Sequence, residues 1–211
     1  MPVSSFFRED PETYEIGVDE VGRGPLFGRV YTAAVVLPKD GSFDHARMKD
    51  SKKFHSKKKI LEAAEYIRAN AVAWAVTYED EKAVDELNIL QATQKSMHRS
   101  IAQLLPLLSK KKALLLVDGN YFNPYAGVPH ECIEGGDDKY SCIAAASILA
   151  KTERDAYIAD LCEKHPELIE RYHLDQNKGY GTKQHMDGIR QYGGTPWHRK
   201  SFGPLKPKPV F

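Results

Sequence analysis

Acidic side chains stand at the ends of three apolar segments that the sequence pattern predicts as β-strands. They are the pairs Asp19-Glu20 and Asp137-Asp138 and the single residue Asp118. Because ligands of open α/β sheets gather at strand ends, we expect these acids to meet at one edge of a sheet. Carboxylates that converge repel one another unless a cation lies among them. Donors that are all oxygen atoms favour Mg²⁺ or Mn²⁺ over zinc.

Each acid also has an ordinary structural explanation. An isolated pair such as Asp118-Gly119 is typical of a turn, and aspartates are common helix caps. The recurrence of acids after successive strands favours a shared metal site instead. Composition and periodicity alone leave both interpretations open.

The hydrophobic pattern predicts the elements that position these acids. Apolar, β-branched runs indicate strands, and apolar residues at helical spacing indicate helices. Three strands in a meander, followed by helix–strand–helix units, indicate a mixed sheet with helices on both faces, an α/β fold. The expected strands cover residues 14–19, 30–37, 71–78, 113–117 and 130–134, and the expected helices cover 56–70, 81–105 with a break near Asn88, 141–163, 166–172 and 182–192.

The composition indicates a globular protein. The 211 residues, 42% of them hydrophobic, are enough to bury a core in one large domain or two small ones. No apolar run approaches the roughly 18 residues of a membrane span, and no signal peptide is apparent. The three cysteines match no zinc motif and are expected to be reduced thiols of a cytoplasmic protein.

Basic residues cluster although the chain has 30 basic and 29 acidic side chains. Residues 171–211 contain eight Lys or Arg and two Asp, and eight minus two gives +6. Charge runs are usually solvated surfaces, but two of them also fit a footprint on the backbone of a nucleic-acid duplex. The second cluster, opposed only by Asp50, comprises Lys49, Lys52, Lys53, Lys57, Lys58 and Lys59.

The segment around the first acids resembles the N-terminal signature of type 2 ribonuclease H, ribonuclease HII. It reads Gly17-Val18-Asp19-Glu20-Val21-Gly22-Arg23-Gly24-Pro25-Leu26. Further blocks of the same family follow in order up to residue 204, which is far more specific than a lone glycine motif. They are Asp50-Ser51-Lys52-Lys53, Asp118-Gly119-Asn120, Gly136-Asp137 with residues 143–151, Lys178-Gly179-Tyr180-Gly181-Thr182, and His198-Arg199-Lys200-Ser201-Phe202-Gly203-Pro204.

The resemblance implies four catalytic, metal-binding acids and a Mg²⁺ or Mn²⁺ cofactor, with two ions when substrate is bound. Asp138 is left out of this set because the family often has a small polar residue there. Asp155 is the main rival for a fourth position, and we interpret it as a helix-surface acid near Lys151 and Arg154. The four acids are Asp19, Glu20, Asp118 and Asp137.

Two residues depart from the family pattern. Arg29 stands where a proline is common, and Gly135 replaces a common lysine ahead of the fourth acid. Neither departure removes a catalytic acid. Both are expected to bear on phosphate contacts or on substrate preference.

The resemblance implies an endoribonuclease that cuts the RNA strand of RNA–DNA hybrids. It also implies incision at single ribonucleotides embedded in duplex DNA, leaving 5′-phosphate and 3′-hydroxyl ends. Selecting a ribonucleotide requires a contact to its 2′-hydroxyl, and glycines let the backbone approach a sugar closely. The expected substrate-binding residues are Gly22, Arg23, Gly24, Lys52, Lys53, Tyr180, Arg199, Lys200 and Ser201.

Two of these assignments have plain alternatives. The Gly22-Arg23-Gly24 segment is also compatible with an ordinary hairpin turn that carries a solvated arginine. Tyr180 resembles the family tyrosine that packs on the sugar at the RNA–DNA junction, but a half-buried core tyrosine is the commoner case.

We expect one ribonuclease H-like catalytic domain over residues 1–211, a five-stranded mixed sheet flanked by helices. Residues 166–204 would form a C-terminal helical substrate-binding segment, and residues 205–211 a mobile tail. Pro209-Val210-Phe211 is interpreted as a frayed terminus rather than a short binding peptide. A monomeric prokaryotic enzyme without the extra N-terminal domain of type 3 enzymes is expected, with no membrane contact and no protein partner indicated.

Two other functions are compatible with parts of the pattern. One is a nuclease or recombinase of the same fold that acts on DNA, against which Gly22-Arg23-Gly24 and Tyr180 argue. The other is a non-catalytic protein that binds hybrids, against which the four intact acids argue.

Overall fold

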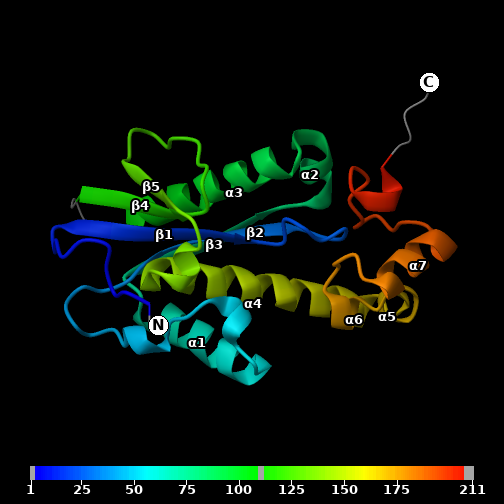
Figure 1. The fold of residues 1–211 in the computed structure, drawn as a ribbon, viewed down its shortest axis with the longest axis horizontal. Coiled ribbons are helices and arrows are strands. Elements are labelled where there is room, and N and C mark those ends of the chain that lie inside the picture. Colours follow the sequence, from blue (N-terminus) through cyan, green and yellow to red (C-terminus); the bar gives the residue numbers. More distant parts are fainter. Residues whose placement is uncertain (1–2, 109–111, 207–211) are drawn as a thin grey trace.

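The computed structural model describes residues 3–108 and 112–206 and contains a five-stranded sheet in the order β3-β2-β1-β4-β5 (Figure 1). The first three strands are antiparallel, whereas β4 and β5 run parallel to β1. The predicted mixed sheet is confirmed. The strands are β1 (Thr13–Val21), β2 (Val30–Val36), β3 (Ala73–Glu79), β4 (Lys112–Asp118) and β5 (His130–Ile133).

Helices cover both faces of the sheet, as Figure 1 shows. On one face α1 and α4 pack on alternate strand residues such as Ala33 and Val35, and on the other α3 packs on Ala34 and Val36. This alternation follows from the two-residue period of a strand. The helices are α1 (Lys57–Asn70), α2 (Glu81–Leu87), α3 (Ile89–Leu104), α4 (Ser141–Lys164), α5 (Glu167–Tyr172), α6 (Leu174–Asn177) and α7 (Lys183–Tyr192).

The break predicted near Asn88 separates α2 from α3. Asn88 has a φ of 68°, a left-handed value that ends α2. Its side-chain oxygen then accepts the backbone N–H of Gln91 at 3.1 Å, which caps the start of α3. The short helix α6 is not predicted from the sequence.

Helix α4 approaches β1 very closely because Gly17 has no side chain. A Cβ atom at Gly17 would lie only 2.1 Å from the backbone carbon of Cys142. The first turns of α4 are therefore held directly against the strand that carries Asp19 and Glu20.

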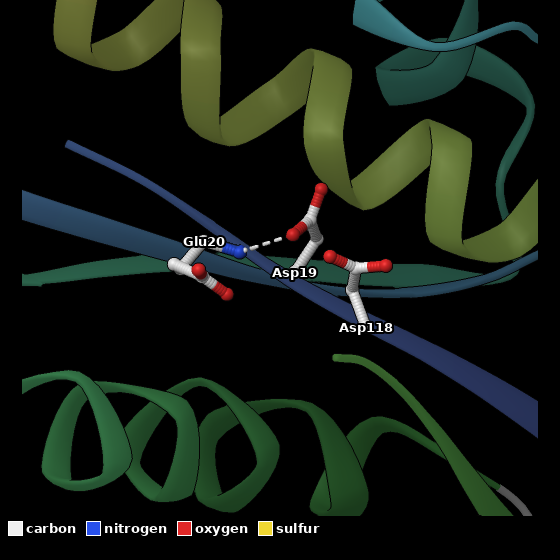
Figure 2. Close-up of side chains that lie close together, drawn as sticks. All are labelled: Asp19, Glu20 and Asp118. Carbon is white, nitrogen blue, oxygen red and sulfur yellow. Dashed lines mark hydrogen bonds between the residues drawn. The ribbon is translucent and has the colours of Figure 1, made fainter. Parts of the chain in front are cut away.

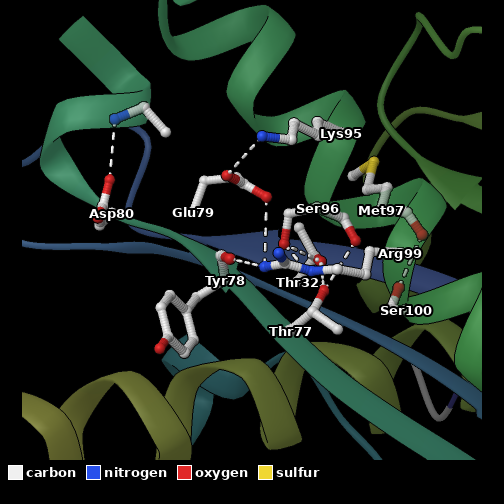
Figure 3. A network of polar contacts seen from close by, with 11 residues as sticks. Thr32, Thr77, Tyr78, Glu79, Asp80, Lys95, Ser96, Met97, Arg99 and Ser100 are labelled. Carbon is white, nitrogen blue, oxygen red and sulfur yellow. Dashed lines mark hydrogen bonds and ion pairs between the residues drawn. The ribbon is translucent and has the colours of Figure 1, made fainter.

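A buried group of hydroxyls joins α3 to the other face of the sheet (Figure 3). The Thr32 hydroxyl on β2 lies 3.1 Å from that of Thr77 on β3 and 2.8 Å from that of Ser96 on α3. At the edge of this network Glu79 forms ion pairs of 3.2 Å with both Lys95 and Arg99. These contacts fix α3 to β2 and β3.

Helices α5, α6 and α7 lie beyond the end of the sheet, beside the last turns of α4 (Figure 1). Their core includes Ile158 of α4, Leu168 of α5 and Ile189 of α7, together with Leu26 and Phe27 from the β1–β2 connection. This cluster joins the C-terminal helices to the loop that follows the first acids. The predicted tail begins at residue 205, and its residues 207–211 lie outside the described part of the chain.

Candidate active site

Three carboxylates meet near the carboxyl ends of β1 and β4. The parallel register pairs Val18 with Val117, so Asp19 and Asp118 follow side by side. One oxygen atom each from Asp19, Glu20 and Asp118 lies within 4.8 Å of the other two (Figure 2). Asp19 is almost fully buried, with 3% of its surface exposed.

Asp19 and Glu20 are adjacent, and neighbours in an extended strand point to opposite faces. Strand β1 does not end at Asp19 but continues to Val21, with Glu20 paired to Thr32 of β2. Asp19 Oδ1 accepts the Glu20 backbone N–H at 2.6 Å (Figure 2). The Glu20 carboxylate still reaches the group and forms a 3.5 Å ion pair with Arg23.

The electrostatics of this group favour a bound cation. Burial raises the pKa of Asp19 well above its usual range, and the charges of Glu20 and Asp118 raise it further, against a hydrogen bond from Ser147. Burial also raises the pKa of Glu20, although Arg23 opposes the shift. A divalent cation among these oxygens would offset both the burial cost and the repulsion. The all-oxygen donor set fits such an ion, and Asp19, Glu20 and Asp118 would hold it.

Asp137 lies beside this group on a short 3₁₀ turn, Gly136–Asp138. The turn is attached to β4 because Asp118 Oδ1 accepts the Gly136 N–H at 2.7 Å. Asp137 is 6% exposed, and burial raises its pKa while Lys52, 3.6 Å away, lowers it. Asp137 is outside the set of oxygens within 4.8 Å of one another.

The two rival acids are engaged elsewhere. Asp138 is half exposed and forms an ion pair with Lys53 at 2.5 Å. Asp155 forms a 3.4 Å ion pair with Lys151 one turn away on α4. Neither belongs to the carboxylate group of the described residues.

The connection that follows β1 is shaped by a glycine and a buried arginine. Gly22 has a φ of 93°, and a Cβ atom there would lie 2.5 Å from Arg154 Nε. Arg154, on α4, is 2% exposed and donates to the carbonyls of Phe27, Arg29 and Lys178 at distances of 2.9 to 3.3 Å. A side chain at residue 22 therefore has no room.

The burial of Arg154 is not predicted from the sequence, in which the residue stands out only as a charged neighbour of Asp155. It lies on the same face of α4 as Ser147, Ala150 and Ile158, which are all buried. Spacings of three to four residues place side chains on one helix face. This spacing is the signal in the sequence from which the burial of Arg154 could have been predicted.

Arg199 also lies beneath this connection. It is fully buried, and its guanidinium donates to the carbonyls of Gly22, Arg23, Pro25 and Gly28 at 2.6 to 3.0 Å. The sequence predicts Arg199 as a substrate-binding residue, whereas in this structure its side chain is buried beneath the loop. Because its donors are occupied by backbone carbonyls, Arg199 supports the loop from inside.

The other predicted contact residues are exposed around the same loop. Tyr180 is 47% exposed, and its Cε1 lies 3.7 Å from the position a Cβ would take on Gly24. Lys200 and Ser201 are exposed, and their backbone N–H groups both donate to the Asp85 carboxylate at 2.8 Å. Lys52 and Lys53 form ion pairs with Asp137 and Asp138.

The sequence around this site matches one known protein family over most of the chain. The family profile described as Ribonuclease HII matches residues 16–204. The chain belongs to the ribonuclease HII family. Among similar ribonucleases HII, that of Parabacteroides distasonis is 46% identical over 188 residues, which cover 89% of each chain. That of Bacteroides thetaiotaomicron is 46% identical over 191 residues, which cover 90% of each.

Solved structures share the fold. The ribonuclease H2 of Pyrococcus horikoshii OT3 superposes with a TM-score of 0.72 at 22% identity, covering 92% of this chain and 95% of its own. The ribonuclease HII of Archaeoglobus fulgidus, solved in a complex with PCNA, gives 0.69 at 24% identity, covering 93% and 98%. These likenesses establish the ribonuclease H-like architecture.

Membership in the ribonuclease HII family makes the protein a divalent-metal-dependent hydrolase, an endoribonuclease that cleaves the RNA strand of RNA–DNA hybrids. The departure at Arg29 has a structural partner, because its guanidinium stacks between Tyr78 at 3.9 Å and Tyr157 at 4.4 Å. The departure at Gly135 lies at a left-handed position with a φ of 62°, where glycine carries no steric cost. No helix within residues 3–108 and 112–206 has the length and hydropathy of a membrane span.

Proposed function

We propose that this ribonuclease HII also incises duplex DNA at single embedded ribonucleotides, leaving 5′-phosphate and 3′-hydroxyl ends. The observation that carries the proposal is the position of the Gly22–Gly24 loop, which continues directly from the strand that bears Asp19 and Glu20 and is packed beside the exposed Tyr180. A sugar read by this loop would place its phosphate near the acids.

Each part of the site then has a distinct task. Asp19, Glu20 and Asp118 would hold one divalent ion, and Asp137 would contribute to the site of a second when substrate is bound. Two bound ions would supply an activated water and stabilisation of the leaving oxygen. No nucleophilic side chain is needed. Mg²⁺ and Mn²⁺ both suit the oxygen donors.

The remaining residues bind and orient the nucleic acid. Backbone groups of Gly22 and Gly24 approach the 2′-hydroxyl, and Tyr180 packs on the sugar at the junction. Arg23, released from Glu20, contacts a phosphate. Basic and polar side chains on either side bind the duplex backbone, namely Lys52, Lys53, Lys200 and Ser201.

We infer that residues 1–211 act as one catalytic domain and as a monomer in the cytoplasm, with residues 166–204 forming a substrate-binding segment. The core cluster shared by α4, α5, α7 and Phe27 supports a single folding unit. The free thiols of Cys132, Cys142 and Cys162 agree with a reducing compartment.

Incision is tested with a DNA duplex that carries one ribonucleotide, incubated with Mg²⁺, Mn²⁺ or a chelator. We expect metal-dependent cleavage at the ribonucleotide that falls by about 10⁴-fold in Asp118→Asn, since that variant loses a metal-ligating charge. Cleavage of an RNA–DNA hybrid without incision at the single ribonucleotide would refute the proposed specificity. Cleavage of neither substrate by folded protein would indicate a hybrid-binding protein.

Tyr180→Ala is expected to lower kcat/KM on the single-ribonucleotide duplex by about tenfold or more, because stacking of a base or sugar on an aromatic ring is lost. Tyr180→Phe should retain most of the activity, since it keeps the ring. If Tyr180→Ala and Tyr180→Phe both kept the preference for the junction, the assignment of Tyr180 would be wrong.

Binding of the duplex should weaken steeply with salt, because phosphate contacts release counterions. Lys53→Gln should reduce the slope of log affinity against log salt by about one unit. Lys164→Gln, which removes an exposed charge paired with Asp160 at the far end of α4, is the control. Fluorescence anisotropy from low to high salt measures the duplex affinity of each protein. If the affinity of the unmodified protein did not change with salt, contacts to the phosphate backbone would be contradicted.

A further inference from the structure

Two histidines that the catalytic site does not use face each other inside the C-terminal helical segment. His185, in the first turn of α7, and His198, next to Arg199, are 0% and 1% exposed. Their Nε2 atoms lie 3.0 Å apart. Phe27 and Tyr172 pack against the His198 ring, each with a centroid distance of 5.0 Å.

The neighbouring groups determine where the protons of this pair lie. The backbone N–H of Thr195 points at His198 Nδ1 at 2.9 Å, so that nitrogen must accept and the His198 proton is on Nε2. Nε2–H then donates to Nε2 of His185, which places the His185 proton on Nδ1. That proton is donated to the carbonyl of Tyr180 at 2.9 Å.

The result is a chain of hydrogen bonds with a single direction, from Thr195 through both rings to Tyr180. It requires both rings to be neutral, since a second proton on either would put two N–H groups face to face. Burial lowers the pKa of both histidines, that of His198 to about 3. The pair therefore stays neutral at neutral pH.

This series of hydrogen bonds connects the two segments that flank the proposed sugar site, the loop at Tyr180 and the segment that contains His198 and Arg199. At one end, the Tyr180 carbonyl accepts from His185 and also from the Thr182 N–H at 2.8 Å. At the other, His198 precedes Arg199, whose backbone N–H donates to the Leu26 carbonyl at 2.9 Å and whose guanidinium holds the Gly22–Gly24 loop.

We propose that His185 and His198 are positioning residues for ribonucleotide recognition, which hold the backbone of Tyr180 at a fixed place relative to the Gly22–Gly24 loop. The inference rests on the proposed role of Tyr180 and of this loop at the sugar. The histidines do not touch substrate. They act through the Tyr180 carbonyl. Their loss therefore lowers cleavage at a single ribonucleotide more than it lowers cleavage of a continuous RNA–DNA hybrid.

The test compares two substitutions of His185 that differ in which ring nitrogen they replace. In His185→Asn, the new side-chain amide falls near the place of Nδ1 and keeps the donor to Tyr180. In His185→Gln, the amide falls near the place of Nε2 and that donor is lost. The readout is the ratio of kcat/KM on the single-ribonucleotide duplex to kcat/KM on an RNA–DNA hybrid.

We expect His185→Gln to lower this ratio by about tenfold, the effect of one lost hydrogen bond, and His185→Asn to keep it within about threefold. A purely structural role would affect both variants and both substrates alike, and that result would overturn the proposal. Tyr180→Ala defines the ratio expected when the ring is absent. If the unmodified enzyme cut hybrids but not the single ribonucleotide, the proposed function itself would fail.

A second measurement is independent of activity. The ¹⁵N chemical shifts of the imidazole nitrogens distinguish the two neutral tautomers. We expect Nδ1–H for His185 and Nε2–H for His198 at neutral pH. The opposite tautomer of His185 would remove the donor to Tyr180 and overturn the proposal, whatever the outcome of the cleavage assays.

Discussion

Replacing Asp19 with asparagine is expected to abolish cleavage and, at the same time, to make the metal-free protein more stable. Asparagine keeps the Oδ1 acceptor for the Glu20 N–H but removes a buried charge that Glu20 and Asp118 repel. We expect kcat to fall by about 10⁴-fold. The free energy of unfolding without metal should rise, because burial and the charges of Glu20 and Asp118 make the ionised Asp19 carboxylate unfavourable in the folded state.

The dependence on pH follows from the direction of the Asp19 shift. Because its pKa is raised in the folded state, the folded protein binds more protons than the unfolded chain above the usual aspartate range. The metal-free enzyme should therefore lose stability as the pH rises through that raised pKa. The stability of Asp19→Asn should fall less over the same rise in pH. Mg²⁺ or Mn²⁺ should restore the stability of the unmodified enzyme at about pH 8.

Calorimetry at about pH 5 and about pH 8, with chelator and with Mn²⁺, measures these effects alongside a cleavage assay. Asp155→Asn is the matched control, because it makes the same change in an acid paired with Lys151 on α4. The control should leave cleavage and the response to metal unchanged. An Asp19→Asn protein that cleaves normally, or that melts below the unmodified protein without metal, would contradict the assignment.

Arg199→Met is expected to destabilise the protein by about 3–5 kcal/mol, because each buried carbonyl left without a donor costs about 1–3 kcal/mol. The substitution leaves four carbonyls of the β1–β2 connection without their donor, among them those of Gly22 and Arg23. Arg199→Lys should recover little of this, since an ammonium group cannot reproduce the fork of a guanidinium. Urea unfolding measures the change.

The neighbouring lysine tests whether this effect is specific to the buried residue. Lys200 is exposed, so Lys200→Met should alter stability by no more than about 0.5 kcal/mol. It should instead weaken duplex binding at low salt. If Arg199→Met kept full stability and lost only binding, Arg199 would contact substrate directly, as the sequence alone suggests.

The layout of the sheet could be predicted because each strand has a clear pattern. The buried run of β4, for example, has Leu115, Leu116 and Val117 at 0% exposure, and its apolar residues are contiguous. The acids could be predicted to meet because they follow such runs, and the structure brings Asp19, Glu20 and Asp118 together. The pattern also indicates the pair Asp137-Asp138 after the fifth strand, and the family resemblance selects Asp137 from that pair.

The buried polar framework under the site could not be predicted in the same way. Arginines are among the residues least often buried, so the sequence indicates Arg154 as a surface charge and Arg199 as a residue that binds substrate. Their role depends on carbonyl groups that converge from distant segments, such as Lys178 and Phe27. Backbone carbonyls are the same in every residue, so the sequence has no pattern that reveals where they gather.

By the proposed assignment of the acids, the pairing of β1 with β4 makes nuclease activity depend on segments that are synthesised late. A ribosome-bound polypeptide that has emerged only through α3 includes Asp19 and Glu20 but has no β4, and therefore no Asp118 beside them. Helix α4, which provides the Ser147 hydroxyl to Asp19, is synthesised later still. A partly made chain thus lacks a complete cation site while it is surrounded by messenger and ribosomal RNA. The proposed assignment therefore implies that competence to cut nucleic acid is acquired only when translation has passed α4.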